Sequence, residues 1–446
     1  MTTKFDGHVF HRGEHGYEEA RRGSVWCAGV ADRYPEMIIQ AKNENDVIAA
    51  VKLANEKGLR LSVRSGGHSW PNNHLREGCL MLDINQLNDY SIDPKSMTAT
   101  AQPGLHGSDL NKVLSTYELY FPTGHCTSVS IGGYLLQGGF GWNGRVYGPA
   151  CMSVIGIDAV TADGKLIHAD EHENADLLWA ARGAGPGFFA VVTRYYIKVY
   201  PRHRITMNST YVYPLDVFEE VFRWSHEIGR ETTCEINTLV SRSEAANNQP
   251  VITLLATAFG DSEVHCREML ALYETCPVRD RAMVANVYQR SSLSQNTQVG
   301  SEGHYWPRMR YVADNIWTHA KFDDLIPGLR KIVDTLPPAP THMVWFNWGS
   351  TNTVKRPDMA FSLEDDFYYA VYAAWSDPED DDKYKRWVTE RMRELEPFSS
   401  GIQLADENLI NRPARFMKDE NLKRLDELRS KYDPNNLFYP WLGRPW

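Results

Sequence analysis

The stretch from Pro35 to Ser69 restricts the fold more than any other part of the sequence. "PEMIIQA" has the pattern of a buried strand, and "LRLSV" has that of a second strand. Between them, "NENDVIAAVKLANEKG" places Val47, Val51 and Ala54 on one helical face and ends at Gly58. These three segments predict a βαβ unit. The loop that leaves its second strand reads "RSGGHS", so the unit ends on two glycines followed by His68.

Glycine is unevenly distributed, with 24 of the 32 glycines in residues 1–203 of a 446-residue chain. This asymmetry predicts that the two parts of the chain form different domains. Within the glycine-rich part we expect further strands and helices, among them the hairpin "VIGIDAVTADGKLIHA", which turns at Asp163 and Gly164. The segment is expected to close with the helix "ENADLLWAARG" and the strand "FFAVVTRYYIKVYP".

After Arg204 long amphipathic segments alternate with strand patterns. Strands are predicted in "ITMNSTYVY", "VITLLATAF", "HMVWFNW" and "DFYYAVYAAW", and helices in "PLDVFEEVFRWSHEIG" and "PEDDDKYKRWVTERMREL". This order favours an antiparallel sheet with helices on one face. Five tryptophans fall between Tyr305 and Trp375. They are core packing or, on the open face of the sheet, the lining of a pocket for a flat or ring-shaped substrate.

Charge and composition exclude several classes of partner. The formal net charge is −10, in short mixed runs, which argues against nucleic acid or an anionic membrane as the main partner. The first residues have no apolar core of a signal peptide, and no later stretch is apolar for long enough to span a bilayer. We expect a soluble, cytoplasmic monomer or homodimer. The seven cysteines contain no CxxC pair, so neither a disulfide framework nor a zinc knuckle is expected.

Two motifs are set aside. Gly139, Gly141 and Gly144 satisfy GxGxxG, but Gly148 and Pro149 interrupt the segment after them, so we expect no helix there to hold a pyrophosphate. The glycine pairs in "IGGYLLQGGFG" still predict close approach of the backbone to phosphates or a ring. His8, His11 and His15 would share a face only in a helix that Gly13 and Gly16 disfavour; no metal site is expected. These two ranges therefore carry no dinucleotide or metal prediction.

Four signatures together resemble one enzyme family. They are "RSGGHS" (64–69), "FPTGHCTSVSIGGYLLQGGFGWNGRVYG" (121–148), "NADLLWAARGAGPGFFAVVT" (174–193) and "YDPNNLF" (432–438). In this order they resemble the vanillyl-alcohol oxidase / p-cresol methylhydroxylase (PCMH-type) FAD-linked oxidases, and more narrowly the berberine bridge enzyme-like branch. The resemblance covers the first 203 residues and the last 30 or so.

The resemblance implies an α+β fold with a PCMH-type FAD-binding domain of two α/β subdomains. A substrate domain, an antiparallel sheet covered by helices on one face, would be inserted into it. The implied ranges are 1–203 for the FAD-binding domain, 204–411 for the substrate domain and 412–446 for a segment that returns to the FAD-binding domain.

The resemblance also implies how FAD is held. His68 would bond to the 8α-methyl group of FAD, and Cys126 would bond to C6 of the same ring. Both steps need a neutral imidazole or a thiolate as the nucleophile. The other implied cofactor-binding residues are Arg64, Ser65, Gly66, Gly67, Ser69, Val129, Gly132, Gly133, Gly138, Gly139, Val192 and Trp441. Val129 stands where the family carries a gate for oxygen, and as a small residue it implies reoxidation by O2 to H2O2.

The sequence departs from the family where a catalytic base would be carried over. Ile402 and Leu404 occupy the places of a Tyr-x-Asn pair, Met152 and Ser153 those of an Asp-Asn pair, and Tyr439, Pro440 and Trp441 follow "NLF" in place of Asn-Gln. Loss of a hydride from carbon still requires a group that accepts the proton of the attached O–H or N–H. The candidates are Tyr369, Tyr372, Tyr439 and His125.

The sequence therefore predicts a bicovalent FAD oxidase. Its small-molecule substrate would be a bulky aromatic or cyclic compound that gives up a hydride from a C–OH, C–N or activated C–H carbon. A carbohydrate oxidase that forms a lactone is the alternative, since aromatic side chains also stack on sugar rings. A flavin-binding protein without turnover is the alternative from another class.

Overall fold

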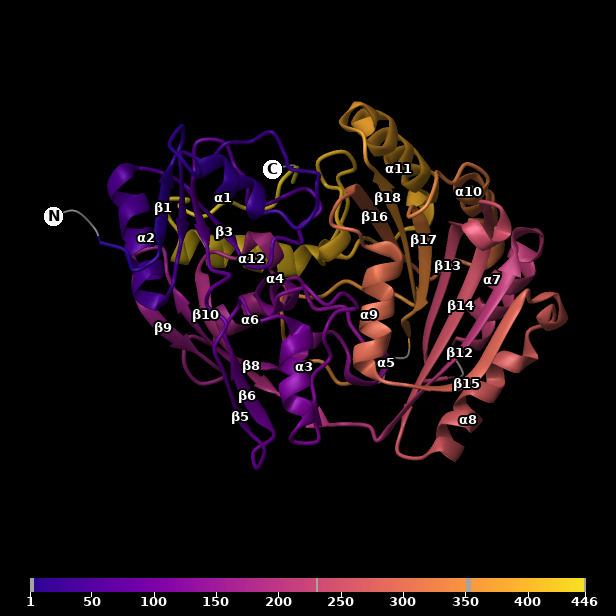
Figure 1. Cartoon of the computed structure of the whole chain (residues 1–446). Coiled ribbons are helices and arrows are strands. Elements are labelled where there is room, and N and C mark those ends of the chain that lie inside the picture. Colours follow the sequence, from indigo (N-terminus) through magenta and orange to yellow (C-terminus); the bar gives the residue numbers. More distant parts are fainter. Residues whose placement is uncertain (1–3, 230–231, 350–353, 445–446) are drawn as a thin grey trace.

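The computed structural model describes residues 4–229, 232–349 and 354–444. Two lobes lie side by side, and the first and last elements of the chain, β1 (His8–His11) and α12 (Asp419–Tyr432), both belong to the left lobe in Figure 1. The last two residues of the predicted returning segment, Pro445 and Trp446, lie outside the described residues.

The predicted βαβ unit forms the first sheet of the left lobe. The helix α2 (Glu44–Lys57) begins after Asn43, whose side chain accepts a hydrogen bond from the Asp46 amide, and ends at Gly58 with φ +63°. The sheet has the order β1-β2-β4-β3, and its β2–β4 and β3–β4 pairs are parallel. Its members are β1 (His8–His11), β2 (Met37–Gln40), β3 (Leu61–Arg64) and β4 (Leu80–Asp83), with α1 (Tyr17–Gly23) beside them.

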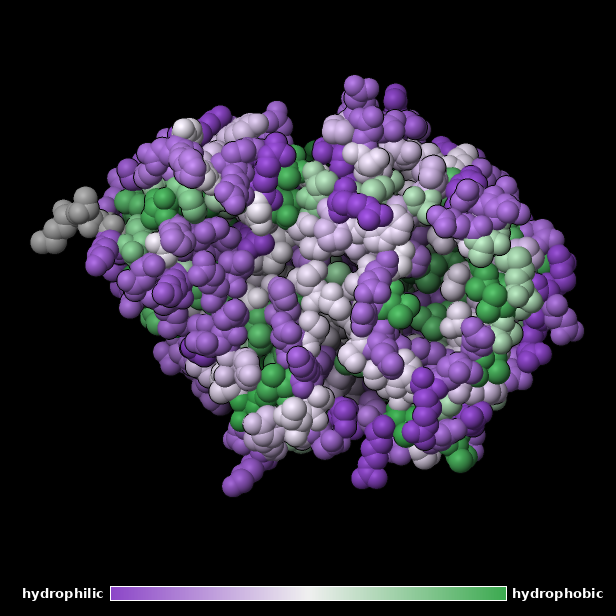
Figure 2. Space-filling view, viewed as in Figure 1, coloured by the Kyte–Doolittle hydropathy of each residue, from purple (hydrophilic) through white to green (hydrophobic). Residues whose placement is uncertain are grey.

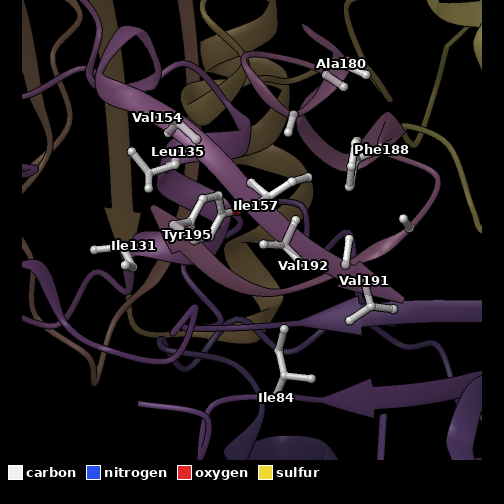
Figure 3. Close-up of a cluster of buried hydrophobic side chains, with 14 of the residues drawn as sticks. Ile84, Ile131, Leu135, Val154, Ile157, Ala180, Phe188, Val191, Val192 and Tyr195 are labelled. Atoms are coloured by element: carbon white, nitrogen blue, oxygen red, sulfur yellow. The ribbon is translucent and has the colours of Figure 1, made fainter. Parts of the chain in front are cut away.

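A second, antiparallel sheet of this lobe has the order β5-β6-β10-β8-β9. Its strands are β5 (Tyr90–Asp93), β6 (Thr98–Ala101), β8 (Val154–Val160), β9 (Leu166–Ala169) and β10 (Val191–Lys198), and β7 (Leu119–Tyr120) pairs separately with β11 (Tyr200–Pro201). The helices are α3 (Gly107–Ser115), α4 (Ile131–Leu136), α5 (Gly144–Tyr147), α6 (Ala175–Ala181) and α12 (Asp419–Tyr432). Figure 3 shows how Tyr195 on β10 packs among Ile131, Leu135 and Val192. Its hydroxyl donates to the Gly132 carbonyl at 2.9 Å, which ties α4 to the sheet.

The expectation that no helix follows Gly144 is wrong. The helix α5 begins there, although it makes only one turn and ends before Gly148, where φ is +75°. Asp158 lies inside β8 and accepts hydrogen bonds from His168 and Tyr196. This single turn does not follow a strand and is not part of a βαβ unit.

The right lobe is one antiparallel sheet with the order β15-β12-β14-β13-β17-β18-β16 (Figure 1). Its strands are β12 (Ile205–Pro214), β13 (Glu235–Ser243), β14 (Gln249–Gly260), β15 (Val284–Ser291), β16 (Arg310–Thr318), β17 (His342–Asn347) and β18 (Phe367–Trp375). The helices α7 (Phe218–Ile228), α8 (Glu263–Ala271), α10 (Phe322–Asp334) and α11 (Asp381–Leu395) bury one face of it. The other face looks toward the left lobe, with α9 (Leu293–His304) between the lobes (Figure 1).

The α+β class and the sheet covered by helices on one face are therefore confirmed. The end of the chain packs on the left lobe, because the Leu61 amide donates to the Leu437 carbonyl and Lys431 pairs with Asp176. The boundaries after residues 203 and 411 stay predictions. Within the described residues, no helix has both the length and the apolar character needed to cross a membrane.

Candidate active site

A cavity of about 620 Å³ lies between the two lobes. In Figure 2 the visible face is largely hydrophilic, with paler and green residues in the hollow between the lobes. Strand ends and loops of the left lobe line one side of the cavity, and the open face of the large sheet and α9 line the other. The cavity therefore brings together residues that are hundreds of positions apart in the sequence.

The loop from Arg64 to Ser69 forms part of the cavity wall where β3 ends. The Arg64 guanidinium binds the Asp83 carboxylate at 3.0 Å and so fixes the end of the strand. Gly67 has φ +74°, and a side chain there would collide with the Ser24 carbonyl oxygen. Among the residues that the structure describes, the amides of Gly66 through Ser69 find no acceptor in the protein. Successive free amides of this kind suit an anion such as a phosphate.

His68 presents a neutral imidazole to the cavity. Its ring stacks on Trp26, with the ring centroids 4.7 Å apart and the planes 29° from parallel. Burial, with smaller effects of His106 and Arg64, lowers the pKa of His68 to about 3. Its Nε2 atom lies 3.0 Å from the Ser128 hydroxyl oxygen. The imidazole therefore keeps a free electron pair near neutral pH.

Cys126 differs from the other six cysteines, which are all buried. Burial raises the pKa of those six thiols. Cys126 is only partly buried, lines the cavity, and has its Sγ 3.7 Å from the Ser128 hydroxyl oxygen. Cys126 is therefore the cysteine that has access to the cavity.

The second glycine-rich loop lies against the first. The Ser65 hydroxyl donates to the Pro103 carbonyl at 2.6 Å, and a side chain at Gly132 would collide with both residues. A side chain at Gly133, in contrast, would meet no atom within 4 Å. The predicted cofactor-binding residues that line the cavity are Arg64, Ser65, Gly66, Gly67, His68, Ser69, Cys126, Val129, Gly132, Gly133, Gly139 and Val192.

Two predicted cofactor-binding residues lie outside the cavity lining. Gly138 faces the Phe361 ring, which a side chain at that position would meet at 2.6 Å. Trp441 packs between Gly187 and Phe416, and its indole N–H has no acceptor among the described residues. The structure therefore gives neither residue a direct contact with the cavity.

Three of the four candidates for the base reach the cavity. His125 contacts Glu235, with Nε2 to Oε1 at 2.5 Å, and Tyr439 lies under the guanidinium of Arg60 at 4.0 Å. Tyr372 stacks on His342. Each of the three lines the cavity.

Tyr369 does not reach the cavity. Because successive side chains of a strand point to opposite faces, Tyr369 faces the helix layer when Tyr368 and Tyr372 face the cavity. It stacks on Trp345, and its hydroxyl has no partner among the described residues. It is therefore unsuited to act on a substrate.

Asp406 is the site residue that the sequence did not single out. Its carboxylate accepts hydrogen bonds from the Trp70 indole at 2.7 Å and from the Tyr368 hydroxyl at 2.5 Å. Burial raises the pKa of Asp406, although hydrogen bonds from Tyr368, Trp70 and Tyr372 and the charge of His125 oppose that rise. Ile402 and Leu404 in the same segment pack in the core, so Ala405 and Asp406 form its cavity wall.

Strand β16 holds the Asp406 segment in place. The Asn315 side chain donates to the carbonyls of Gln403 and Asp406 at 3.0 and 2.9 Å. Asp314, which is buried, receives two hydrogen bonds from Arg412. These hydrogen bonds join residues that are far apart in the sequence. No periodic pattern in the sequence indicates them.

The sheet side of the cavity is uncharged. Asn208, Thr210, Asn237, Thr253 and Gln295 supply amides and hydroxyls. Leu239, Leu255, Val344, Phe346, Tyr305, Tyr368 and Tyr372 supply apolar and aromatic surface. Burial lowers the pKa of His304 to about 4 and that of His342 to about 3, so both imidazoles are neutral at pH 7. In the described part of the chain no group of three or more acidic, histidine or cysteine side chains is placed to hold a metal.

Comparisons with known proteins show to which family the chain is similar. These matches concern the family of the chain: a family model described as "FAD binding domain" matches residues 35–170, and one described as "Berberine and berberine like" matches residues 402–441. The chain is 33% identical over 424 residues to the FAD-linked oxidoreductase nodO of Hypoxylon pulicicidum, covering 94% of this chain and 93% of that protein.

Solved structures share the fold. The chain is similar to 6-hydroxy-D-nicotine oxidase from Arthrobacter nicotinovorans, with a TM-score of 0.83, 22% identity and coverage of 98% and 97% of the two chains. It is also similar to a chitooligosaccharide oxidase, with a TM-score of 0.81, 19% identity and coverage of 97% and 96%. At these identities the likeness concerns the fold.

Proposed function

The chain belongs to the berberine-like FAD-linked oxidoreductases, and from that premise we propose that it is an oxidase with doubly attached FAD and a bulky, uncharged, cyclic substrate. One observation carries the proposal. The same cavity is lined by a neutral His68, an accessible Cys126 and the buried carboxylate of Asp406. The first two suit attachment of a flavin, and the third suits acceptance of a proton.

The residues present fit FAD. The free amides from Gly66 to Ser69 would bind the pyrophosphate, and Gly133 leaves room for close approach of the cofactor. His68 and Cys126 would hold the ring system covalently, and Val192 and Gly139 would line its site. Once bound, FAD would supply an acceptor for two electrons at N5 of its ring system.

Double attachment is tested by acid precipitation followed by peptide mass spectrometry. We expect flavin on the peptides that contain His68 and Cys126. The variants His68→Ala and Cys126→Ala should each keep one bond, and Cys151→Ala, which removes a buried thiol, is the matched control. Flavin that stays wholly in the supernatant of the parent protein would contradict double attachment.

Asp406 would act as the proton acceptor. A substrate O–H or N–H next to Tyr368 can pass its proton along the phenol to the carboxylate, since Tyr368 already donates to Asp406. Burial and the nearby negative charge of Asp406 raise the pKa of Tyr368 well above its usual value, so the phenol stays protonated at pH 7. Tyr368 therefore serves as a relay, and the carboxylate holds the proton.

The substrate class follows from the lining of the sheet side. The described lining residues of β12 to β18 and α9 include no Lys, Arg, Asp or Glu, so a charged group placed against this side of the cavity would lose its hydration without gaining a partner there. Stacking aromatics near Asp406 suit a ring. The carbon that gives up its hydride would carry O–H, N–H or an activated C–H bond.

A carbohydrate oxidase that forms a lactone is the second candidate function. The amides of Asn208, Asn237 and Gln295 favour it, because they can hydrogen-bond several hydroxyl groups. Bleaching of the yellow flavin under anaerobic conditions distinguishes the two functions. Bleaching by oligosaccharides alone supports the carbohydrate oxidase, and bleaching by aromatic or polycyclic alcohols and amines supports the leading proposal.

Molecular oxygen would be the electron acceptor, with H2O2 as the product. Val129 lines the cavity and leaves more room beside the ring system than a larger side chain would. Rapid mixing of the reduced protein with aerated buffer should give fast reoxidation, and Val129→Leu should slow it by about tenfold or more while leaving reduction by substrate unchanged. Slow reoxidation of the parent protein would contradict the assignment as an oxidase.

A further inference from the structure

Ser128 lies between the two proposed attachment residues. Its hydroxyl oxygen is 3.0 Å from Nε2 of His68 and 3.7 Å from Sγ of Cys126. We infer that Ser128 is a positioning residue for flavin attachment: its hydroxyl selects the ring tautomer of His68 and orients the sulfur of Cys126. The inference rests on the proposed double attachment and names the residue that would position both attachment residues.

The donors and acceptors allow two arrangements of this chain of contacts. In one, Nε2–H of His68 donates to the Ser128 oxygen, and the Ser128 hydroxyl donates to Cys126. In the other, Cys126 donates to Ser128, and Ser128 donates to Nε2, which puts the ring proton on Nδ1. Only the first satisfies both contacts when Cys126 is a thiolate, and it leaves the electron pair of Nδ1 free to form a bond.

The surroundings favour a fixed position for the hydroxyl. The Thr127 amide donates to the Ser301 hydroxyl of α9 at 2.9 Å, and the Thr127 carbonyl accepts from the Ser108 hydroxyl of α3 at 2.7 Å. The Val129 carbonyl accepts from the Gly107 amide at 3.0 Å. The loop is therefore held on both sides of Ser128.

The attachment steps balance with O2 as the oxidant. At His68 a C–H bond of the 8α-methyl group and the N–H of the imidazole are replaced by a C–N bond. At Cys126 the C6–H bond and the S–H bond are replaced by a C–S bond. In each step two electrons and two protons pass to one O2, which becomes H2O2. Ser128 forms and breaks no covalent bond in either step. Its hydrogen bonds position Nδ1 of His68 and the sulfur of Cys126 toward the ring system.

The test measures attachment itself. Full-length protein prepared without flavin is mixed with FAD in air, and acid-stable flavin is measured over time for each site by peptide mass spectrometry. In a Cys126→Ala background, adding Ser128→Ala should slow bonding to His68 by about tenfold, as expected for loss of a hydrogen bond that holds the nucleophile. In a His68→Ala background it should slow bonding to Cys126 similarly. NMR of the flavin peptide should show bonding at Nδ1 alone in the parent protein and at both nitrogens in Ser128→Ala.

Two controls separate the hydroxyl from the loop. Ser128→Thr keeps a hydroxyl and should restore the rate and the single isomer. Ser301→Ala removes one of the hydrogen bonds that hold the same loop but keeps the Ser128 hydroxyl, so it should slow attachment less than Ser128→Ala does and should keep the single isomer. Circular dichroism and noncovalent FAD binding check that each variant is folded. Parent-like rates and a single isomer in Ser128→Ala overturn the inference alone; a parent protein that releases all its flavin in acid overturns the double attachment and the inference together.

Discussion

Asp406 is a carboxylate whose hydrogen-bond donors come from two distant segments of the chain. Trp70 follows the first glycine loop, and Tyr368 and Tyr372 lie on β18. The donors stabilise the charged form of Asp406, whereas burial destabilises it. Burial has the larger effect, so the pKa of Asp406 is raised. A carboxylate with a raised pKa is a better proton acceptor than an exposed one.

Asp406→Asn should slow flavin reduction by substrate by about 10²–10⁴-fold, the usual contribution of a positioned acid or base. Asn keeps the shape but cannot take the proton. In the parent protein the rate should fall as pH drops through the raised pKa of Asp406, and this acid limb should be missing in the variant. Stopped-flow reduction under anaerobic conditions, at several pH values, measures both effects. An unchanged rate, or an acid limb that persists in Asp406→Asn, would place the base elsewhere.

The alternation of side chains on β18 decides which tyrosines can take part in chemistry. Tyr368→Phe removes both the proposed proton relay and a hydrogen-bond donor to Asp406. The reduction rate should therefore fall, the pKa of Asp406 should rise further, and the acid limb of the rate should move to higher pH. Tyr369→Phe, one residue away, should leave the rate and its pH profile unchanged. Because the Tyr369 hydroxyl has no partner among the described residues, its removal should stabilise the fold by about 1 kcal/mol. Stopped-flow profiles and denaturant unfolding test the pair; equal effects of the two variants on the rate would contradict the assignment of faces.

Local patterns predicted the elements that carry strong signals. The βαβ unit appears because Asn43 and Gly58 cap a helix with a clear apolar face. The glycine loops were recognisable because their glycines are placed where another residue would not fit. Gly67 has a positive φ, and at Gly132 a side chain would collide with Ser65 and Pro103. In β18 the strand itself was evident, but every residue of that strand is apolar or aromatic, so the sequence does not tell which face is covered.

The unpredicted parts depend on tertiary contacts. Asp406 lies in a short 3₁₀ turn, Leu404–Asp406, whose place is set by the side chain of Asn315 on a distant strand. The helix α9 contains Gly300 and Gly303, which are poor helix formers, and its position between the lobes gives it partners in both. Neither feature leaves a periodic signal in the sequence.

Across the whole molecule, buried ionisable groups make stability depend on pH in two opposite ways. Burial, opposed by bonds from Leu409 and Asn73, raises the pKa of Glu407 to about 7. The folded state then holds a proton that the unfolded state has lost between about pH 4.5 and 7, so this group's contribution to stability falls as pH rises through that window. Relative to Glu407→Gln, the parent's free energy of unfolding should fall by about 3 kcal/mol across it. Urea unfolding of both proteins at several pH values measures the difference; parallel curves would contradict the raised pKa.

His342 acts with the opposite sign. Burial lowers its pKa to about 3, so below about pH 6.5 the unfolded state binds a proton that the folded state does not. Its contribution is complete above pH 6.5 and is lost as pH falls toward 3. Relative to His342→Gln, the parent should lose about 2 kcal/mol between pH 6.5 and 5. Urea unfolding again gives the comparison, and His15→Gln, which changes an exposed histidine, is the control. A parent that loses no more stability than His342→Gln would contradict the assignment.

The positions of His68 and Cys126 have a consequence for the chain as a polymer. His68 follows a strand of the first sheet, and the chain passes through β5 and β6 of the second sheet before it reaches Cys126. With both residues bonded to one flavin, the cofactor would close a covalent ring of about 60 residues through both sheets. Such a ring restricts the unfolded chain as a disulfide does and would add about 4 kcal/mol to the stability of the fold. The redox group would then also be a permanent cross-link, found in a chain whose own cysteines form no disulfide.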